Sequence, residues 1–447
     1  MNEPIISVSG LRGLVPKQFT PLVAINYVSA YASTMPEGKV ILSRDGRSSG
    51  EMIALAVTST LIGHGHEVID IGTAATPTVG VQVRVQRAAG GIQISASHNP
   101  IEYNGLKLFG SDGRVLKKAK GDDVLKSYRA GRTRWNAVQE LGKVRKLDDP
   151  HTAHKDKILA TVNVKAIQQR KFRVLLDSNH GAGSALGRLL LESLGCEVTV
   201  LGEQPDGQFE HVPEPIADNL GKVCEAVANG SFNVGFCQDP DADRLSIIDE
   251  KGNFVGEEMT LAFCLMQFLP KNSGIIVTNC ASSSYAKFLA KKHKVAMYLS
   301  PVGEANVVEK MMEHHAVFGG EGNGGPIDPR VGYVRDSFVG MALVLDLMAS
   351  TKQPISALAS QMPSLAMYKD KIQLAGSLIP KYIERLGLAI EAPNISRQDG
   401  LRWDWEDRWL LVRPSNTEPI IRLIAEAPTL EDARKLCENA RRFTKGL

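Results

Sequence analysis

A serine that follows a short apolar segment is the first candidate for chemistry in this chain. Residues 91–94 (GIQI) read as a buried strand, and Ser97 follows with His98 and Asn99 beside it. Open α/β folds place their functional side chains where such strands end. Further along, Lys107 offers a mobile cation that can lower the pKa of a hydroxyl or neutralise a phosphate. We interpret Ser97 as a candidate covalent nucleophile, with an ordinary turn as the alternative.

Three aspartates at alternate positions form the second candidate site. Asp239, Asp241 and Asp243 lie in the segment DPDADR, directly after the apolar residues 232–237. Like charges at this spacing repel one another, and a hard divalent cation is the usual reason for such a cluster. A calcium loop has similar spacing, but it requires glycine where Arg244 stands and helices where strands are expected. The pattern favours a magnesium site completed by phosphate oxygens or water, with a solvated acidic turn as the alternative.

Two later loops carry side chains suited to hydroxyls and phosphate. Glycines surround Glu321 and Asn323, which lets a ligand approach closely while the carboxylate and the amide bind its hydroxyls. This loop is neither a P-loop nor a dinucleotide motif, because no Gly-Lys-Ser/Thr follows and prolines block a helix. Arg413 opens the segment RPSNTEP, whose donors suit a phosphate dianion. The alternatives are a flexible linker and an ordinary cap. The further residues expected to bind this phosphate are Ser415, Asn416, Thr417 and Arg422.

The elements that must position these loops repeat along the chain. Residues 39–72, 172–202 and 274–300 each read as an apolar strand, a loop of small polar residues, a helical segment and a second apolar strand. The repeat is longer than that of a solenoid and indicates three homologous α/β domains with mixed sheets. A composition change near residue 367 opens a smaller C-terminal α+β domain. The expected domains are residues 1–150, 151–254, 255–367 and 368–447.

Composition excludes several functional classes. The 447 residues are 43% hydrophobic and 23% charged with a net charge of +3, which is ordinary for a globular protein. Neither a basic stripe for nucleic acid nor an apolar run of membrane-spanning length is present in the sequence. The six cysteines are scattered, and the N-terminus lacks the pattern of a secretory signal. We therefore expect a cytoplasmic protein without nucleic-acid or membrane partners.

Together these loops resemble those of the α-D-phosphohexomutases. SASHNP with NGLKLF is similar to the family's phosphoserine loop, DPDADR to its magnesium loop, GEGNGG to its sugar-recognition loop and RPSNTEP to its phosphate-binding loop. SGLRG and SRDGRSS resemble two N-terminal motifs, which would place Arg12, and with it Arg44, near Ser97. The resemblance covers essentially the whole chain and implies four domains in a heart-like arrangement.

The resemblance implies a phosphoryl transfer between C6 and C1 of a hexose phosphate. Ser97 would carry the phosphoryl group and, together with Asp239, Asp241 and Asp243, bind one Mg²⁺ per chain. A hexose 1,6-bisphosphate would be the intermediate and the activator. Lys107, His98 and Arg12 would stabilise the transferring group or move protons. The expected partner is the hexose phosphate, and the expected assembly is a monomer or a homodimer.

The sugar-recognition loop departs from the GExSGH form of many relatives. Asn323 replaces the serine, and Gly325 stands where the histidine would be, which leaves the proton-transfer role of that histidine unassigned. GEGNGG is similar to the form in archaeal-type phosphoglucosamine mutases and phosphomannomutases, so we expect conversion of glucosamine 6-phosphate to glucosamine 1-phosphate. A phosphoglucomutase or phosphomannomutase activity is the alternative. A phosphatase using the same serine and a non-catalytic sugar-phosphate sensor are further alternatives.

Overall fold

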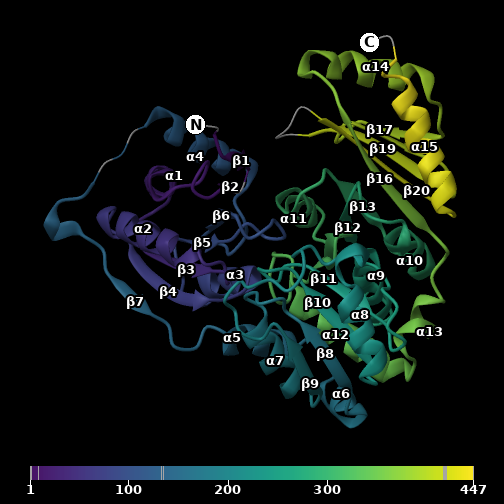
Figure 1. Ribbon diagram of the computed structural model, residues 1–447, viewed down its shortest axis with the longest axis horizontal. Coiled ribbons are helices and arrows are strands. Elements are labelled where there is room, and N and C mark those ends of the chain that lie inside the picture. Colours follow the sequence, from purple (N-terminus) through teal and green to yellow (C-terminus); the bar gives the residue numbers. More distant parts are fainter. Residues whose placement is uncertain (1–2, 9, 132, 134, 416–419, 446–447) are drawn as a thin grey trace.

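The computed structural model describes residues 3–8, 10–131, 133, 135–415 and 420–445. In Figure 1 the first domain (purple to blue) and the fourth (yellow) lie at opposite ends, and the second and third domains lie between them. Three mixed α/β sheets are followed by one antiparallel sheet, which confirms the expected fold class. Within the described parts of the chain, no helix has the length and apolar content needed to cross a membrane.

The first domain is built on a seven-stranded sheet with the order β1-β2-β6-β5-β3-β4-β7. Its main elements are β1 (Ile5–Ser7), β2 (Gly10–Leu14), α1 (Pro21–Thr34), β3 (Lys39–Arg44), α2 (Gly50–Gly63), β4 (Glu67–Thr73), α3 (Thr76–Val85), β5 (Gly90–Ile94), β6 (Tyr103–Gly110), α4 (Lys118–Ala130) and β7 (Val144–Lys146). Val40 and Leu42 of β3 pack with α1 and α2, while Ile41 packs with α3. Both faces of the sheet are therefore buried, as the continuous apolar strands predict.

The second domain has a four-stranded sheet with the order β11-β10-β8-β9. Its main elements are α5 (Thr152–Leu159), α6 (Val164–Arg170), β8 (Arg173–Asp177), α7 (Ser184–Ser193), β9 (Glu197–Leu201), α8 (Gly221–Asn229), β10 (Val234–Gln238) and β11 (Leu245–Ile248). The third domain has the order β13-β12-β14-β15. Its elements are α9 (Glu257–Phe268), β12 (Ile276–Asn279), α10 (Tyr285–His293), β13 (Met297–Ser300), α11 (Glu304–Glu313), β14 (Phe318–Glu321), β15 (Gly325–Ile327), α12 (Ser337–Thr351) and α13 (Ile355–Ala359).

The three α/β domains repeat one topology. In each domain, one central strand (β3, β8 or β12) lies between two parallel strands. One of these two, β5, β10 or β14, is followed in sequence by an antiparallel strand that pairs with it. The resulting orders are β4-β3-β5-β6, β9-β8-β10-β11 and β13-β12-β14-β15. The repeat expected from the sequence is thereby confirmed. Each hairpin between the last two strands carries one of the predicted loops: Ser97 follows β5, the aspartates follow β10, and the glycine-rich segment follows β14.

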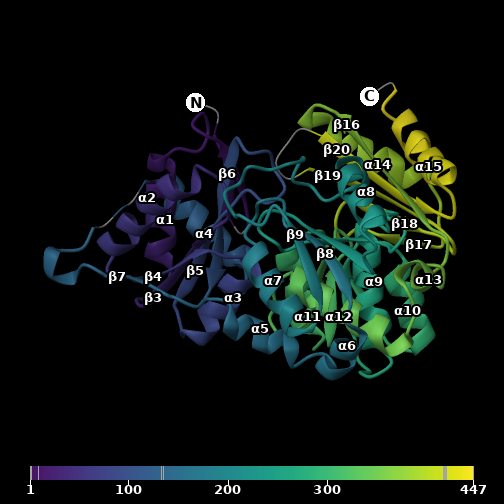
Figure 2. The same ribbon diagram turned by 60° about the horizontal axis from the view of Figure 1, so that its bottom comes forward.

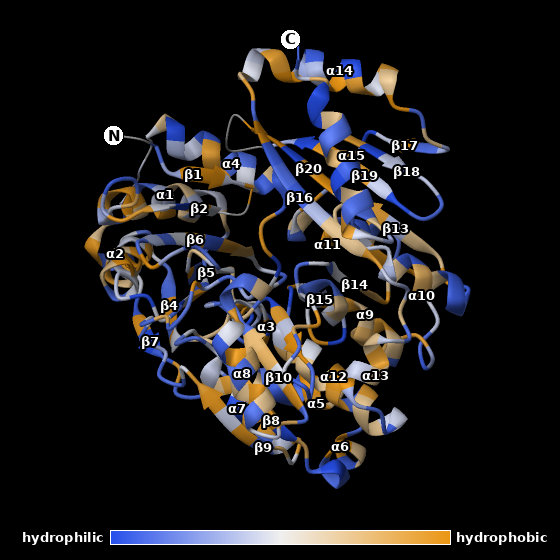
Figure 3. Ribbon diagram, turned by 45° about the vertical axis from the view of Figure 1, so that its right-hand side comes forward, coloured by the Kyte–Doolittle hydropathy of each residue, from blue (hydrophilic) through white to orange (hydrophobic). Residues whose placement is uncertain are grey.

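Helix α12 joins the second and third domains in a single hydrophobic core. It is buried almost all round, and α5, α6, α7 and α9 surround it (Figure 2). Figure 3 shows this helix in orange, the colour of hydrophobic residues. Phe338 of α12 belongs to the same core as Leu176 of β8 and Phe318 of β14. The start of α12 is fixed by Asp336, whose side chain accepts hydrogen bonds from two backbone N–H groups of the first turn.

The fourth domain is a five-stranded antiparallel sheet with the order β16-β20-β19-β18-β17. Its main elements are β16 (Ala366–Gln373), α14 (Ile379–Ala389), β17 (Asn394–Ser396), β18 (Leu401–Asp404), β19 (Trp409–Pro414), β20 (Ile420–Ala427) and α15 (Leu430–Arg442). Trp409 and Leu411 of β19 pack on Cys280 of the third domain. Glu426 accepts hydrogen bonds from the Trp409 indole and from Ser284 N. The boundaries expected at residues 150, 254 and 367 stay predictions.

The shared core generates a prediction about stability. Replacing Phe338, which is fully buried, with alanine should lower the free energy of unfolding by about 3–5 kcal/mol, because a cavity is left beside well-packed neighbours. Phe288→Ala is the matched control, since Phe288 on α10 is 38% exposed. Urea denaturation followed by circular dichroism measures both variants. Equal losses for the two would contradict the role of α12 as the centre of a shared core.

Candidate active site

Ser97 lies in the loop between β5 and β6, in a left-handed backbone conformation. Its φ is 51°, which costs about 1–2 kcal/mol for a residue with a side chain. Ser97 N donates a hydrogen bond to Ser95 Oγ at 2.8 Å, and Ser95 Oγ donates to Asp45 Oδ2 at 2.6 Å. The Ser97 hydroxyl donates to Asp239 Oδ2 at 2.8 Å. This serine is therefore fixed in an unfavourable conformation with its hydroxyl against a carboxylate of another domain, which an ordinary turn does not require.

All five N–H donors of the Arg47 guanidinium are used, and four of them hold this loop. Nε donates to Asp45 Oδ2 at 3.1 Å. The two terminal nitrogens donate to four backbone carbonyls of the loop, those of Ser97, Asn99, Pro100 and Tyr103. The Arg47 and Asp45 side chains are fully buried. A lysine has only three donors on one nitrogen and cannot reproduce this fork.

Asp239, Asp241 and Asp243 form one buried cluster between β10 and β11. All three are 0% exposed, and one carboxylate oxygen from each lies within 4.8 Å of the others. Ala242 turns the chain between them with a φ of 54°. Burial, and then the charges of Asp243 and Asp241, raise the pKa of Asp239 well above its ordinary value. The cluster is therefore electrostatically unfavourable unless cations neutralise it.

Two cations from the other domains enter this cluster. Lys107 of β6 donates from Nζ to Asp241 Oδ2 and, at 2.8 Å, to Asp243 Oδ2. Arg335, which precedes α12, donates from Nη2 to Asp243 Oδ2 at 2.6 Å. Burial alone would lower the pKa of Lys107, but Asp241 and Asp243 outweigh it, so that this pKa is raised and the amine is protonated. Burial likewise opposes the ionised form of Asp243, yet Arg335 and Lys107 hold its pKa below the ordinary value.

The aspartate cluster fits a divalent ion. Asp241 Oδ1 and Asp243 Oδ1 are buried and have no hydrogen-bond partner among the described residues. Asp239 presents a third carboxylate to the same point and accepts from the Ser97 hydroxyl. Carboxylate oxygens are the ligands that Mg²⁺ prefers, and it usually keeps further positions for phosphate and water. The chemistry of the donor set therefore agrees with the magnesium site expected from the sequence.

His98, Arg12 and Arg244 are further groups close to Ser97, and Arg244 Nε lies 4.0 Å from Asp239 Oδ2 and 3.9 Å from Asp243 Oδ1. His98 Nδ1 lies 3.2 Å from Ser97 Oγ. The charge of Arg244, then burial and then the charge of Arg12 lower the pKa of His98 well below its ordinary value, so this imidazole is neutral. Arg244 is partly buried, and its Nε has no hydrogen-bond partner among the described residues. Guanidinium groups around a buried hydroxyl favour a bound anion such as phosphate.

The glycine-rich loop brings Glu321 and Asn323 to the same region. Glu321 ends β14 and is 3% exposed. Its Oε1 accepts from Asn279 Nδ2 at 2.6 Å and from Gly303 N at 3.0 Å, and its Oε2 accepts from Arg335 Nη1 at 2.9 Å. The amide oxygen of Asn323 is buried and has no hydrogen-bond partner in the described parts of the chain. Such an oxygen is well suited to accept a hydrogen bond from a ligand hydroxyl.

The fourth-domain residues form a separate group. Arg413 Nε lies 2.8 Å from Asp399 Oδ2, and the same oxygen accepts from Val302 N of the third domain at 3.0 Å. Arg422 is exposed and lies opposite Arg413 in the antiparallel pair of β19 and β20. Ser415 N donates to the carbonyl of Ile420 at 2.9 Å, which closes the base of the predicted phosphate loop. The other two predicted residues, Asn416 and Thr417, lie outside the described residues.

Two arginines in this region were missed by the sequence analysis. Arg47 contacts the Ser97 loop, whereas Arg44, expected there, ends β3 with its Cδ beside Gly50. Arg335 joins the aspartate loop to the glycine-rich loop. Arg47 is part of the motif SRDGRSS, so the sequence did offer a signal for it. Its partners in the loop are backbone carbonyls, however, and a pattern of side chains does not reveal such contacts. The only sequence signal for Arg335 was its position just before a strongly apolar helix.

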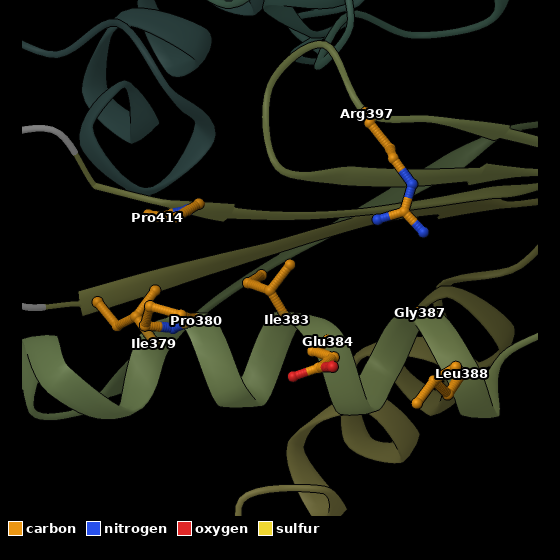
Figure 4. A pocket seen from close by; sticks show the side chains of 8 residues that line it. All are labelled: Ile379, Pro380, Ile383, Glu384, Gly387, Leu388, Arg397 and Pro414. Carbon is orange, nitrogen blue, oxygen red and sulfur yellow. The ribbon is translucent and has the colours of Figure 1, made fainter.

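A groove in the fourth domain is distinct from the cluster of site residues around Ser97 and the three aspartates. It has a volume of about 460 Å³ and lies between α14 and the strands. Figure 4 shows Ile379, Ile383 and Leu388 on the helix and Arg397 on the opposite side. Its lining is largely apolar and contains none of the predicted site residues. Charge and geometry therefore place the candidate active site at the three hairpin loops.

Comparisons with known proteins extend over nearly the whole chain. Four successive profiles of the phosphoglucomutase/phosphomannomutase family match the chain: α/β/α domain I at residues 5–134, domain II at 152–252, domain III at 257–365 and the C-terminal domain at 371–442. A Thermococcus kodakarensis protein named "Phosphoglucomutase/phosphomannomutase" is 34% identical over 445 residues, covering 96% of both chains. A Pyrococcus horikoshii protein named "Probable phosphoglucosamine mutase" is 33% identical, covering 98% of this chain and 97% of its own.

A solved structure supports the same fold. The crystal structure of a phosphoglucomutase/phosphomannomutase family protein from Burkholderia thailandensis superposes with a TM-score of 0.86 at 24% identity, over 99% of this chain and 98% of that one. The family profiles span all four domains, and the identities above extend over nearly the whole chain. The protein therefore belongs to the α-D-phosphohexomutase family, and it is a phosphohexomutase, an enzyme that transfers a phosphoryl group within a hexose phosphate.

Proposed function

We propose that this phosphohexomutase interconverts glucosamine 6-phosphate and glucosamine 1-phosphate through phospho-Ser97 and a 1,6-bisphosphate. The observation that carries the proposal is the position of the Ser97 hydroxyl, 2.8 Å from Asp239 Oδ2 at the buried carboxylate cluster. The left-handed conformation and the Arg47 clamp fix this hydroxyl before any substrate arrives. In a phosphoryl transfer, such fixed positions and electrostatic stabilisation supply most of the catalysis.

The metal site of the proposal consists of Asp239, Asp241, Asp243 and a phosphorylated Ser97. A bound Mg²⁺ would neutralise charge on the transferring phosphoryl group. The unpartnered oxygens of Asp241 and Asp243 support one ion per chain at this point. In the structure Lys107 and Arg335 both donate to the other oxygen of Asp243, Oδ2, which holds this carboxylate in place.

Catalytic roles are assigned to the side chains that surround Ser97. The bond from Ser97 Oγ to phosphorus breaks as a bond forms from phosphorus to the free hydroxyl oxygen of the hexose phosphate. The proton of that hydroxyl ends on Ser97 Oγ, which leaves as a serine hydroxyl. The protonated Lys107 and the guanidinium of Arg12 stabilise the charge of the transferring group. His98, at 3.2 Å from Ser97 Oγ, is placed to exchange a hydrogen bond with that oxygen as it leaves or attacks. The bisphosphate then reorients and returns its other phosphate to Ser97.

Substrate binding is assigned to the third and fourth domains. The amide oxygen of Asn323 and the remaining lone pair of Glu321 accept hydrogen bonds from sugar hydroxyls. The phosphate that does not react is bound by the fourth-domain loop. Its proposed ligands are Arg413, Ser415, Asn416, Thr417 and Arg422. An enzyme that works at both ends of one sugar needs such a second phosphate site, because the two phosphates exchange places between the half-reactions.

Glucosamine phosphate is proposed as the preferred substrate on the basis of the GEGNGG loop and a relative named as a phosphoglucosamine mutase. A relative of equal similarity is named a phosphoglucomutase/phosphomannomutase, so glucose and mannose phosphates are the second candidate. We also propose a cytoplasmic location, a hexose 1,6-bisphosphate activator, and a monomer or homodimer. All six cysteines are free, as is usual in a reducing compartment.

The test of this function is a ³¹P NMR time course with Mg²⁺ and a trace of hexose 1,6-bisphosphate. Glucosamine 6-phosphate, glucose 1-phosphate and mannose 1-phosphate are supplied in separate tubes. We expect isomerisation without free phosphate, fastest with the glucosamine compound. Release of free phosphate would instead indicate a phosphatase, and no reaction in any tube would favour a sensor.

Ser97→Ala should abolish this isomerisation and leave the protein folded, because a loop hydroxyl contributes little to the core. Ser59→Ala, at an exposed position of α2, is the matched control and should react at the wild-type rate. Circular dichroism establishes that both variants are folded. Normal isomerisation by Ser97→Ala would refute the phosphoserine.

Asp241→Asn should weaken the apparent affinity for Mg²⁺ by at least about tenfold, because one of the three carboxylate charges is lost from the donor set. A Mg²⁺ titration of the isomerisation rate measures this, with Asp218→Asn, an exposed position, as control. An unchanged titration would mean that the aspartate loop does not bind the metal.

Arg47→Lys should lower kcat by about 100-fold, since the Ser97 loop loses most of its four hydrogen bonds from Arg47 and small displacements of a reacting group are costly. KM should change much less, because Arg47 contacts the loop and not the sugar. Steady-state kinetics separate the two constants. A rise in KM at constant kcat would place Arg47 in substrate binding and not in positioning.

A further inference from the structure

Arg335 connects two functional loops that belong to different domains. Nη1 donates to Glu321 Oε2 at 2.9 Å, and Nη2 donates to Asp243 Oδ2 at 2.6 Å. Its backbone N donates to Glu304 Oε1 at 2.8 Å. Arg335 is only 7% exposed and directly precedes Asp336, the residue that caps α12. One rigid, planar guanidinium group thus spans the carboxylates of Glu321 and Asp243.

Gly325 supplies the space for this side chain. A Cβ atom at position 325 would lie 2.4 Å from Cδ of Arg335 and 2.9 Å from its Cγ. Such separations are far shorter than carbon atoms tolerate, so any other residue at this position would push the Arg335 stem away. Gly325, the glycine that departs from the GExSGH form, is therefore required for the contacts of Arg335 with Glu321 and Asp243. We call these two contacts the bridge.

The bridge limits how Glu321 can act. Three donors already bind its carboxylate: Asn279 Nδ2 and Gly303 N on Oε1, and Arg335 on Oε2. A carboxylate has about four acceptor positions, so roughly one is left for a sugar hydroxyl. The direction of that remaining position is set by Arg335. Because the Arg335 guanidinium contacts both Glu321 and Asp243, it fixes the distance between a sugar bound to Glu321 and the metal loop.

Charge explains why this contact persists. Arg335 forms ion pairs with Asp243, Glu321 and Glu304, at 2.6, 2.9 and 3.6 Å. Lys107 binds the same oxygen of Asp243 from the first domain. Separating Arg335 from its partners would leave buried carboxylates without a counter-charge, which is strongly unfavourable. The bridge is therefore a fixed structural link.

We propose that Arg335 is a positioning residue that fixes the sugar-binding carboxylate Glu321 relative to the metal-loop carboxylate Asp243, and that Gly325 is required for it. The proposal rests on the phosphohexomutase function proposed above. Its consequence is that the acceptor hydroxyl of the sugar meets phospho-Ser97 at a set distance and angle. Gly325, which stands where many relatives have a histidine, then serves to make room for Arg335 and takes no part in proton transfer.

The experiment is a double-mutant cycle on these two residues. Gly325→Ala should lower kcat by about 100-fold, because displacement of Arg335 misplaces the sugar. In an Arg335→Ala background, the same Gly325→Ala change should have almost no further effect, since the side chain it displaces is gone. A full, additive loss in that background would overturn the link between the two residues.

Conservative and control variants separate positioning from charge. Arg335→Lys keeps the cation but cannot span two carboxylates, so kcat should fall while KM changes less. Arg330→Lys is the matched control, because Arg330 pairs with Asp328 outside the site, and its kinetics should equal those of the wild type. Wild-type kcat in Arg335→Lys would overturn the proposal.

Mn²⁺ binding to the protein alone, measured by electron paramagnetic resonance, gives a readout independent of activity. Arg335→Ala should bind Mn²⁺ more tightly than the wild type, because a competing cation beside Asp243 is removed, whereas general damage to the fold would weaken binding. Arg335→Lys should bind it with unchanged affinity. Weaker Mn²⁺ binding in both would overturn the assigned bridge.

These readouts also separate this proposal from the proposed function. If the wild-type protein isomerises no hexose phosphate, the proposed function fails. The coupling of Gly325 and Arg335 in Mn²⁺ affinity then decides the bridge by itself: non-additive affinities support it, and additive affinities refute it.

Discussion

The balance of charge among buried side chains at the three hairpin loops is the constraint on which the rest of the structure depends. Asp239, Asp241 and Asp243 are completely buried, and burying each charge costs several kcal/mol unless it is compensated. Arg244 of the same loop lies within 4.0 Å of Asp239 and Asp243, and two further cations come from other domains, Lys107 from the first and Arg335 from the third. Correct charge pairing therefore requires that the three domains adopt one relative arrangement. The same arrangement leaves unpartnered oxygens on two of the aspartates, where a divalent ion fits.

One topology serves three different chemical tasks. Each α/β domain places its functional loop in the hairpin between the last two strands of the repeated order, β5–β6, β10–β11 or β14–β15. Each of these loops contains one residue with left-handed backbone: Ser97, Ala242 and Gly324. The scaffold provides the edge of a sheet and a tight turn, while the side chains at the turn differ. The Ser97 hydroxyl contacts Asp239, and Arg335 joins Asp243 to Glu321 of the third loop. This division suits the proposed function, in which the three loops supply the nucleophile, the metal ligands and the sugar-binding groups.

The fourth domain is coupled to this centre by a short series of polar contacts. Arg413 pairs with Asp399, which accepts a hydrogen bond from Val302 N, and the next residue, Gly303, donates to Glu321. The apolar contact between the third and fourth domains is small and centres on Cys280, Trp409 and Leu411. Interfaces of this kind permit relative movement of domains. Arg413 is thus connected to Glu321 through Asp399 and residues 302–303.

The sequence by itself determined the features that depend on local pattern. Apolar strands ending in small polar residues, the alternation of Asp239, Asp241 and Asp243, and the threefold repeat of strand, loop and helix were all readable, because strand burial and metal-ligand spacing are written in consecutive residues. Only the tertiary structure decided the contacts of Arg47 and Arg335, whose partners lie 50 residues away in Ser97 and 92 residues away in Asp243. Such contacts follow from strand order and domain packing. For the same reason the equivalence of the three hairpin loops emerged only when the sheets were paired, since hydrogen bonding between strands brings distant segments into register and no local pattern encodes it.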